Sequence, residues 1–172
     1  QLYTMSKVSG KIALVTGGSR GIGASIVEHL VKEGADVAFT YLSSPDRAAT
    51  LVNQLQGHGV RVKAYQSNAS DHTQCKDLIA QVIQDFGKID ILVNNAGITR
   101  DNLLVRMTEE QWDEVLDSNL KSAFNLCKYV LTPMMRQRSG SIINISSVVG
   151  VFGNAGQANY AASKAGMIGF TK

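Results

Sequence analysis

A glycine-rich turn at residues 16–23 limits the fold of this chain more than any other feature. It follows an apolar run at residues 12–15, which is typical of a strand buried on both faces of a parallel sheet. It precedes an amphipathic segment that ends at Gly34. Glycines let a backbone approach a pyrophosphate, and a helix start offers free N–H groups and partial positive charge. The sequence therefore predicts a βαβ unit with a nucleotide site at its first turn.

Strand-like and helix-like segments alternate along the rest of the chain. A serine and a proline at Ser44–Pro45 open one predicted helix, and capping-box pairs begin the next two, at Asp71 and Thr108. Pro133 is expected to kink or restart the last of these. Strands are expected at residues 12–15, 36–41, 60–65, 88–93 and 141–145, and helices at 45–56, 71–86 and 108–131 and from about 157 to the end.

This alternation predicts an α/β fold, a doubly wound parallel sheet of the Rossmann type with right-handed crossovers. The expected strand order is 3-2-1-4-5, with the ligand crevice at the carboxyl ends of strands 1 and 4. Residues 1–172 read as a single dinucleotide-binding and catalytic domain, because no linker or repeat interrupts the pattern.

Composition narrows the class of protein. Hydrophobic residues make up 44% of the 172 and charged residues 18%, which is typical of a globular domain and argues against disorder. A net charge of +3 does not indicate nucleic-acid binding. No apolar run approaches the roughly 20 residues of a membrane span. Cys75 and Cys127 form no CxxC pair, so we expect reduced thiols and no metal site, in the cytoplasm or an organelle stroma.

The end of the second strand bears on which dinucleotide would bind. An Asp or Glu about 20 residues after the glycines usually contacts the ribose 2′-OH of NAD. Here the strand runs into Leu42 and Ser43, with no carboxylate before Asp46. Arg20, inside the glycine turn, can pair with a phosphate. These residues favour NADP(H) over NAD(H); the alternative is that Arg20 is a solvated loop charge.

Two polar sites follow later elements. Asn94-Asn95-Ala96-Gly97 comes directly after the fourth strand, where small residues and amides can line a nucleotide site, or can form a plain turn. Asn119 lies within a predicted helix, where an amide is mildly unfavourable. It could be a surface residue, or it could point inward and hold a water near Lys164.

Tyr160 and Lys164 are four residues apart, so a helix places them on one face. A phenol has a reference pKa of about 10 and exchanges protons poorly near neutrality. A neighbouring ammonium favours the phenolate and lowers that pKa toward a useful range. Ser147 follows an apolar run, as a side chain at the carboxyl end of a buried strand would, and its hydroxyl could hold a substrate carbonyl. Taken alone, the Tyr-x-x-x-Lys spacing could equally be a tyrosine and a lysine on a helix surface with no catalytic role.

Together these motifs resemble the short-chain dehydrogenase/reductase family. The sequence carries TGGSRGIG, NNAG, Asn119, Ser147 and the YxxxK pair, and the resemblance extends from Gly10 to the end. It is greatest to the 3-oxoacyl-[acyl-carrier-protein] reductases of fatty acid synthesis, through NNAGITRDNLLVRM, SSVVG and GNAGQANYAASKAGMIGFTK.

The resemblance implies roles for single residues. Tyr160 would be the general acid, Lys164 would lower its pKa and bind the nicotinamide ribose, and Ser147 would orient the carbonyl. Asn119 would position a water that links Lys164 to solvent. The residues implied to hold the cofactor are Gly17, Gly18, Ser19, Arg20, Gly21, Ile22, Gly23, Leu42, Ser43, Asn68, Ala69, Asn95, Ala96, Gly97, Tyr160 and Lys164.

The resemblance also implies partners. The substrate would be carried by an acyl carrier protein, an acidic partner for which Arg136 and Arg138 are candidate contacts, with Lys128 nearby. The alternative is that these are cations of a solvated helix end. The helices that bear Asn119 and Lys164 would pack against partner subunits in a homotetramer.

The family continues beyond the position of Lys172 with further strands and a substrate lid, so we expect a C-terminally incomplete domain. We expect a polypeptide ending there to be poorly soluble and inactive, with an open sheet edge at strand five. Two alternatives to the carrier-protein reductase stay open: a related reductase acting on acyl-CoA or another ketone or alcohol, and a non-catalytic dinucleotide-binding module.

Overall fold

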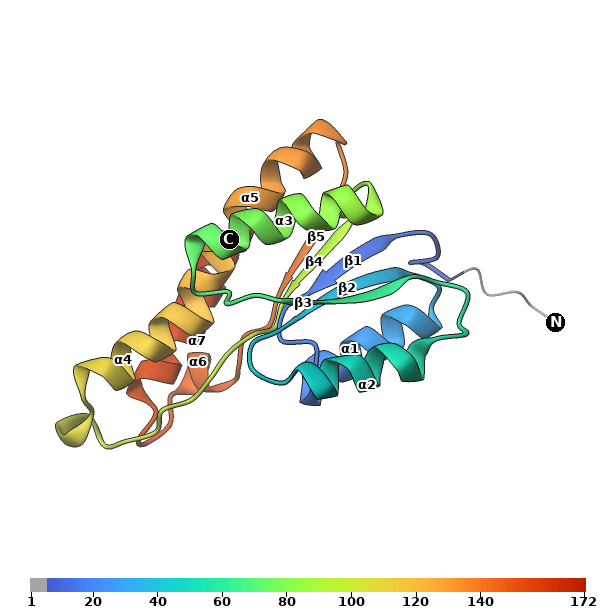
Figure 1. The fold of residues 1–172 in the computed structure, drawn as a ribbon. Helices are drawn as coiled ribbons and strands as arrows, with labels where there is room; N and C mark the ends of the chain where they lie inside the picture. The colour runs from blue at the N-terminus through green and yellow to red at the C-terminus, as the bar shows by residue number, and fades with distance from the viewer. Residues whose placement is uncertain (1–5) are drawn as a thin grey trace.

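The computed structural model describes residues 6–172, and its centre is a parallel sheet of five strands in the order β3-β2-β1-β4-β5 (Figure 1). Every neighbouring pair is parallel, and Val15 of β1 is paired with Phe39 of β2 and with Val93 of β4. The predicted fold class and strand order are confirmed. The strands are β1 (Ile12–Val15), β2 (Asp36–Tyr41), β3 (Val62–Gln66), β4 (Ile91–Asn94) and β5 (Ser141–Asn144).

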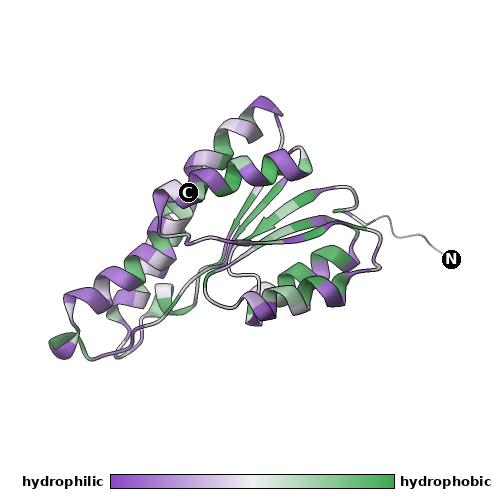
Figure 2. Cartoon of the chain, in the orientation of Figure 1, coloured by the Kyte–Doolittle hydropathy of each residue, from purple (hydrophilic) through white to green (hydrophobic). Residues whose placement is uncertain are grey.

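Helices cover both faces of the sheet, as a parallel sheet requires. One face packs against α1 (Gly21–Lys32) and α2 (Pro45–Leu55), and the other against α3 (His72–Phe86) and α5 (Ser122–Arg136). Their inward stripes and the strands are apolar, while their outer faces are polar (Figure 2). Fully buried residues such as Phe39, Leu14 and Leu92 form the two cores.

Helix starts follow the predicted caps. Thr108 and Gln111 form the reciprocal capping box at the start of α4 (Glu109–Leu116). Asp71 accepts the N–H of Gln74 at the start of α3. Ser44 occupies the cap position of α2, but its side chain makes no capping bond.

One helix prediction is wrong in detail. The expected continuous helix at residues 108–131 is α4, a π-helical segment (Asp117–Lys121) and α5. Pro133 does not interrupt it, since α5 continues to Arg136. Proline removes one N–H from the hydrogen-bond ladder, yet the helix continues for three residues beyond it. The break lies instead at the π segment, which contains Asn119.

The fifth strand is an edge of the described sheet. Its residues alternate between exposed and half-buried, and Ile143 is 47% exposed, as expected of the open sheet edge predicted at strand five. An apolar run shows that a strand is able to be buried, but not how many faces are covered. Two short elements were not predicted: a 3₁₀ turn (Leu104–Arg106) and α6 (Val149–Phe152), which lies beside α7 (Ala158–Thr171).

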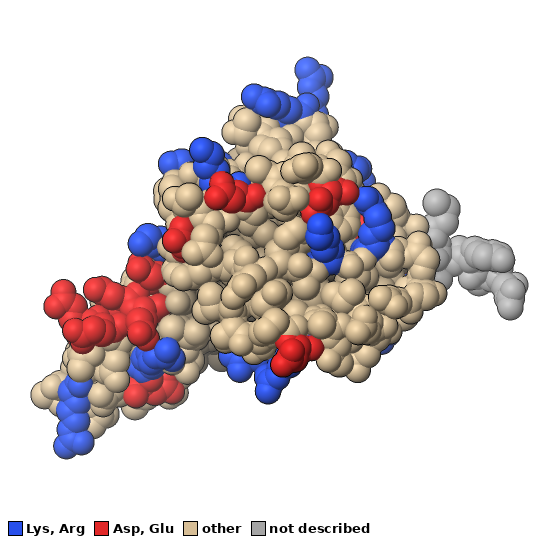
Figure 3. Space-filling view, in the orientation of Figure 1, with Lys and Arg blue, Asp and Glu red and all other residues tan. Residues whose placement is uncertain are grey.

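Two groups of like charge stand out among the charged residues of the face shown in Figure 3. Red carboxylates cover α4, and blue cations lie at the end of α5 (Figure 3). Within residues 6–172, no helix combines the length and apolar character that a membrane crossing needs. Over the same residues, His, Cys, Asp and Glu nowhere gather into a set of three that would hold a metal ion.

Candidate active site

A cleft of about 580 Å³ opens at the carboxyl ends of β1, β2, β3 and β4, where an open α/β sheet binds its ligand. Its walls come from the turns after four strands and from Ser118 of the π segment. The predicted cofactor-binding residues that line it are Gly17, Ser19, Arg20, Gly21, Ile22, Gly23, Leu42, Ser43, Asn68, Ala69, Asn95, Ala96 and Gly97.

Tyr160 and Lys164 were also predicted to bind the cofactor but do not line this cleft, and neither does Gly18. Gly18 lies against the core, where a Cβ atom would come within 2.6 Å of Phe39 Cβ. Its N–H donates to the Thr40 carbonyl at 2.8 Å, and the N–H of Gly17 donates to the Thr40 hydroxyl at 3.0 Å. Gly18 therefore anchors the turn to β2.

Thr16 anchors the other side of the turn. Its buried hydroxyl accepts the backbone N–H groups of Asn95 and Ala96 at 3.0 and 2.9 Å. The Asn95 amide donates to the carbonyls of Thr16 and Gly17 at 2.9 and 3.3 Å. The turns after β1 and β4 thus form one rigid unit. Sequence reasoning missed Thr16 and Thr40; the signal was a hydroxyl residue at the end of each apolar strand.

The backbone conformation and close contacts of the turn favour glycine at positions 17, 21 and 23. Gly17 and Gly21 have positive φ values of 63° and 54°, which favour glycine. A Cβ atom on Gly23 would lie 2.1 Å from the Gly17 carbonyl oxygen. The turn is therefore closed on itself, with its backbone exposed to the cleft.

The start of α1 suits an anion. No acidic residue lies in its first turn and no side chain caps it, whereas α4 begins with Glu109 and Glu110. The first N–H groups of a helix lack partners within the helix and carry partial positive charge. Among the described residues that line the cleft, Arg20 is the only charged one. The residues present therefore fit a phosphate-bearing dinucleotide.

Asn119 is fully buried and points inward. Its amide pairs with the backbone of Ile98, accepting the N–H at 2.7 Å and donating to the carbonyl at 3.0 Å, and it also donates to the Ser163 hydroxyl at 3.1 Å. A Cβ atom on Gly97 would lie 3.0 Å from Asn119 Oδ1 and 3.8 Å from Lys164 Nζ. Asn119 and Lys164 therefore meet at the Gly97 end of the cleft.

Lys164 is buried, with 4% of its surface exposed. Its ammonium donates to the Ile145 carbonyl at 2.7 Å and lies 5.7 Å from the centre of the Tyr160 ring. Burial disfavours the charged form and lowers the pKa of Lys164 below its ordinary value. The predicted pairing of an ammonium and a phenol on one helix face is thus present in α7.

Ser147 lies between β5 and α6, and its hydroxyl accepts the N–H of Val149 at 3.2 Å. The hydroxyl of the preceding Ser146 donates to the Lys164 carbonyl at 2.8 Å. A Cβ atom on Gly150 would lie 2.6 Å from the carbonyl carbon of Lys164, so α6 touches the backbone of α7. These contacts hold the segment that carries Ser147 against the helix that carries Tyr160 and Lys164.

Arg136 and Arg138 lie away from the cleft. They are exposed and come just before Ser141, where β5 begins, so they lie at the amino edge of the sheet. Lys128 lies on α5 with its ammonium about 6 Å from the rings of Phe124 and Tyr129.

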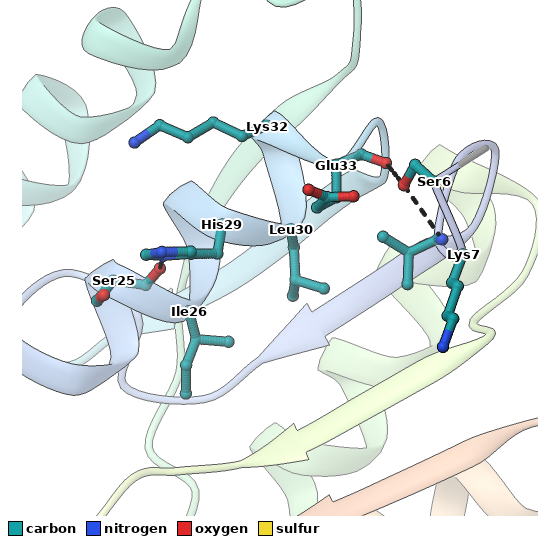
Figure 4. Close-up of a pocket in the computed structure, with 9 residues that line it drawn as sticks. Ser6, Lys7, Ser25, Ile26, His29, Leu30, Lys32 and Glu33 are labelled. Atoms are coloured by element: carbon teal, nitrogen blue, oxygen red, sulfur yellow. Dashed lines mark hydrogen bonds between the residues drawn. The ribbon is translucent and has the colours of Figure 1, made fainter. Parts of the chain in front are cut away.

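A second hollow, of about 810 Å³, lies between α1 and residues 6–8 (Figure 4). Ser6 there donates to the Glu33 carbonyl, and the His29 ring is hydrogen bonded to the Ser25 carbonyl. None of the predicted site residues lines this hollow. Its larger volume therefore does not make it the better candidate.

The sequence and the fold match known proteins. A family model for short chain dehydrogenases matches residues 11–172. The 3-oxoacyl-[acyl-carrier-protein] reductase FabG of Staphylococcus epidermidis is 53% identical over 162 residues, which cover 94% of this chain and 66% of that protein. FabG of Thermotoga maritima is 49% identical over 166 residues, covering 96% and 67%.

Among solved structures, a "putative short-chain alcohol dehydrogenase" from Sinorhizobium meliloti 1021 superposes with a TM-score of 0.92 and 34% identity. The match covers 97% of this chain and 66% of that one. The chain thus spans slightly less than two thirds of the length of the first of these relatives.

Proposed function

Because the chain belongs to the short-chain dehydrogenase family, we propose that its protein is an NADPH-dependent 3-oxoacyl-[acyl-carrier-protein] reductase of fatty acid synthesis. The observation that carries the proposal is the cluster of Asn119, Lys164 and Tyr160 at the Gly97 end of a dinucleotide-sized cleft. The two FabG relatives support this substrate class.

The residues take the following roles in this proposal. Arg20 and the start of α1 hold the phosphates, and the Asn95–Gly97 turn borders the nicotinamide, which supplies a hydride when bound. Ser147 donates a hydrogen bond to the substrate carbonyl oxygen. The Tyr160 hydroxyl gives its proton to that oxygen.

Lys164 and Asn119 support the proton transfer. The Lys164 ammonium stabilises the phenolate that remains on Tyr160, because the two groups share one face of α7. Both N–H groups of the Asn119 amide already bind Ile98 and Ser163. The Asn119 side chain therefore holds the Ile98 backbone in place beside Lys164. The backbone of Asn119, and not its side chain, would then position the water.

The preference for NADPH rests on Arg20. Arg20 forms no ion pair with any residue in the described part of the chain, and no carboxylate lines the cleft there. We expect Arg20→Ala to raise the KM for NADPH about tenfold, because a charge-assisted hydrogen bond to the 2′-phosphate is lost. The KM for NADH should change less than about twofold. Equal effects on both KM values, measured by steady-state kinetics, would contradict this role.

Whether the acyl group is carried by an acyl carrier protein or by CoA can be tested by reversing charges on the protein surface. We expect the native full-length protein to reduce acetoacetyl-carrier protein with a higher kcat/KM than acetoacetyl-CoA. Reversing Arg136 and Arg138 to Glu should raise the KM for the carrier-bound substrate about tenfold and leave the CoA ester unaffected, because an acidic partner loses its attraction. A preference for the CoA ester would favour an acyl-CoA reductase. An unchanged KM would remove the arginines from the interface.

We also propose that the protein self-associates, as a homotetramer, through an apolar groove of about 430 Å³ between the π segment and α7. Phe124 and Phe170 line this groove and are 47% and 42% exposed in the single chain. A light-scattering mass equal to that of a monomer would contradict this proposal.

A further inference from the structure

The cleft wall formed by Ser67, Asn68, Ala69 and Ser70, which we call the β3–α3 loop, is held by a side chain from outside the loop. Asn125 of α5 donates from its one amide nitrogen to the carbonyl of Ala69 at 3.1 Å and to that of Ser70 at 3.2 Å. Asn125 is 1% exposed. Both of its N–H groups are therefore used on two consecutive carbonyls of the loop.

A second contact fixes the direction in which this amide is turned. Asn125 Oδ1 lies 2.9 Å from Nδ1 of His72, and an amide oxygen can only accept a hydrogen bond. Nδ1 of His72 therefore carries a proton. Nε2 of His72 lies 2.7 Å from the Tyr129 hydroxyl, which donates to it when the ring is neutral. His72 thus links Tyr129 to Asn125, and each partner restricts the orientation of the next.

This polar network is unusual for its location. Elsewhere α3 and α5 pack through apolar side chains such as Leu78, Val82, Leu126 and Val130, and the two helices lie side by side in Figure 1. A buried amide costs free energy unless its hydrogen bonds are satisfied. A leucine at position 125 would pack between the helices without that cost. A leucine would, however, leave the carbonyls of Ala69 and Ser70 without the hydrogen bonds that Asn125 donates to them. The contact that requires asparagine is the one to the loop.

We propose that Asn125 is a positioning residue for the dinucleotide cleft, acting through Ala69 and Ser70, and that His72 and Tyr129 hold its amide in the required orientation. This inference rests on the proposed function: because the nicotinamide lies at the Asn95–Gly97 turn after β4, the β3–α3 loop, at the other end of the cleft, borders the adenosine half of the cofactor. Asn125 itself does not line the cleft. Replacing Asn125 should therefore weaken the binding of the dinucleotide and leave the rate of the chemical step unchanged.

The test is Asn125→Asp in the native full-length protein, with Asn53→Asp as the matched control. The carboxylate has the shape of the amide but no N–H groups, so it faces two carbonyls that it cannot bind. Asn53 lies exposed on α2, where the same change should have little effect. We expect the Kd for NADPH, from fluorescence titration, to rise roughly 10- to 100-fold in Asn125→Asp. It should change less than about twofold in Asn53→Asp.

Two further readouts distinguish positioning from general damage. At saturating NADPH, kcat should stay within about twofold of the wild type. Reduced nicotinamide mononucleotide, which lacks the adenosine half, should bind with unchanged affinity. If Asn125→Asp does not fold, as judged by circular dichroism, His72→Leu provides the test, with an expected rise in the NADPH Kd of roughly 3- to 10-fold.

The outcomes separate this inference from the function it rests on. Equal NADPH binding by the wild type and the variants overturns the role of Asn125 alone. So does an equal loss of NADPH and mononucleotide binding, or a loss confined to kcat. A wild-type protein that binds neither NADPH nor NADH overturns both proposals.

Discussion

Tyr160→Phe is expected to lower kcat by roughly 10²- to 10⁴-fold, the contribution typical of a positioned general acid. The change removes one oxygen and leaves the ring, whose centre lies 5.7 Å from Lys164 Nζ. The lysine keeps its bond to the Ile145 carbonyl, so the end of the cleft is preserved. The Kd for NADPH should therefore change less than about threefold. Stopped-flow turnover at saturating NADPH and a fluorescence titration measure the two quantities.

Tyr65→Phe is the matched control, because it removes the same atom from a tyrosine that belongs neither to the cleft wall nor to the Asn125 network. Its hydroxyl bonds to Asp85, and its loss should leave both kcat and the Kd for NADPH within about twofold. If Tyr160→Phe retained the wild-type kcat, Tyr160 would not be the proton donor. If it lost NADPH binding as well, the tyrosine would instead support the cofactor.

Much of the fold follows from local patterns. Apolar runs of four to six residues separated by amphipathic segments specify parallel strands, and a right-handed crossover leaves few possible orders. The glycine turn, the capping box at Thr108 and the Asp71 cap could be located because each has a distinctive residue at a fixed spacing. These features depend on neighbours in sequence, which is why sequence reasoning found them.

Other features depend on contacts that no local pattern contains. The glycines of the turn are equivalent in sequence, yet Gly18 packs on Phe39 while Gly23 closes the turn. The π segment at Asn119 adds a residue to a helical turn without a breaker. Asn125 resembles a surface residue until α3 and α5 are placed together. Gly18 and Asn125 meet partners that lie far away in the chain, so only the tertiary structure identifies their roles.

The contact made by Gly23 leads to the second large effect. We expect Gly23→Ala to weaken NADPH binding by at least about 100-fold, which corresponds to nearly 3 kcal/mol. An added Cβ atom would lie 2.1 Å from the Gly17 carbonyl oxygen and 2.6 Å from the Asn95 amide nitrogen. The first of these is backbone, which cannot rotate away, so the turn must open. Overpacking should also lower the free energy of unfolding by about 1–3 kcal/mol.

Gly169→Ala is the control, since a Cβ atom there has nothing within 4 Å. Gly169 lies inside α7, where alanine has the better helix propensity, so this variant should be slightly more stable than the wild type. Its NADPH affinity should be unchanged. Chemical denaturation and fluorescence titration of the two variants separate loss of the turn from loss of the fold. Wild-type NADPH affinity in Gly23→Ala would show that the turn is not the phosphate site, because the start of α1 cannot keep its position once Gly17 has moved.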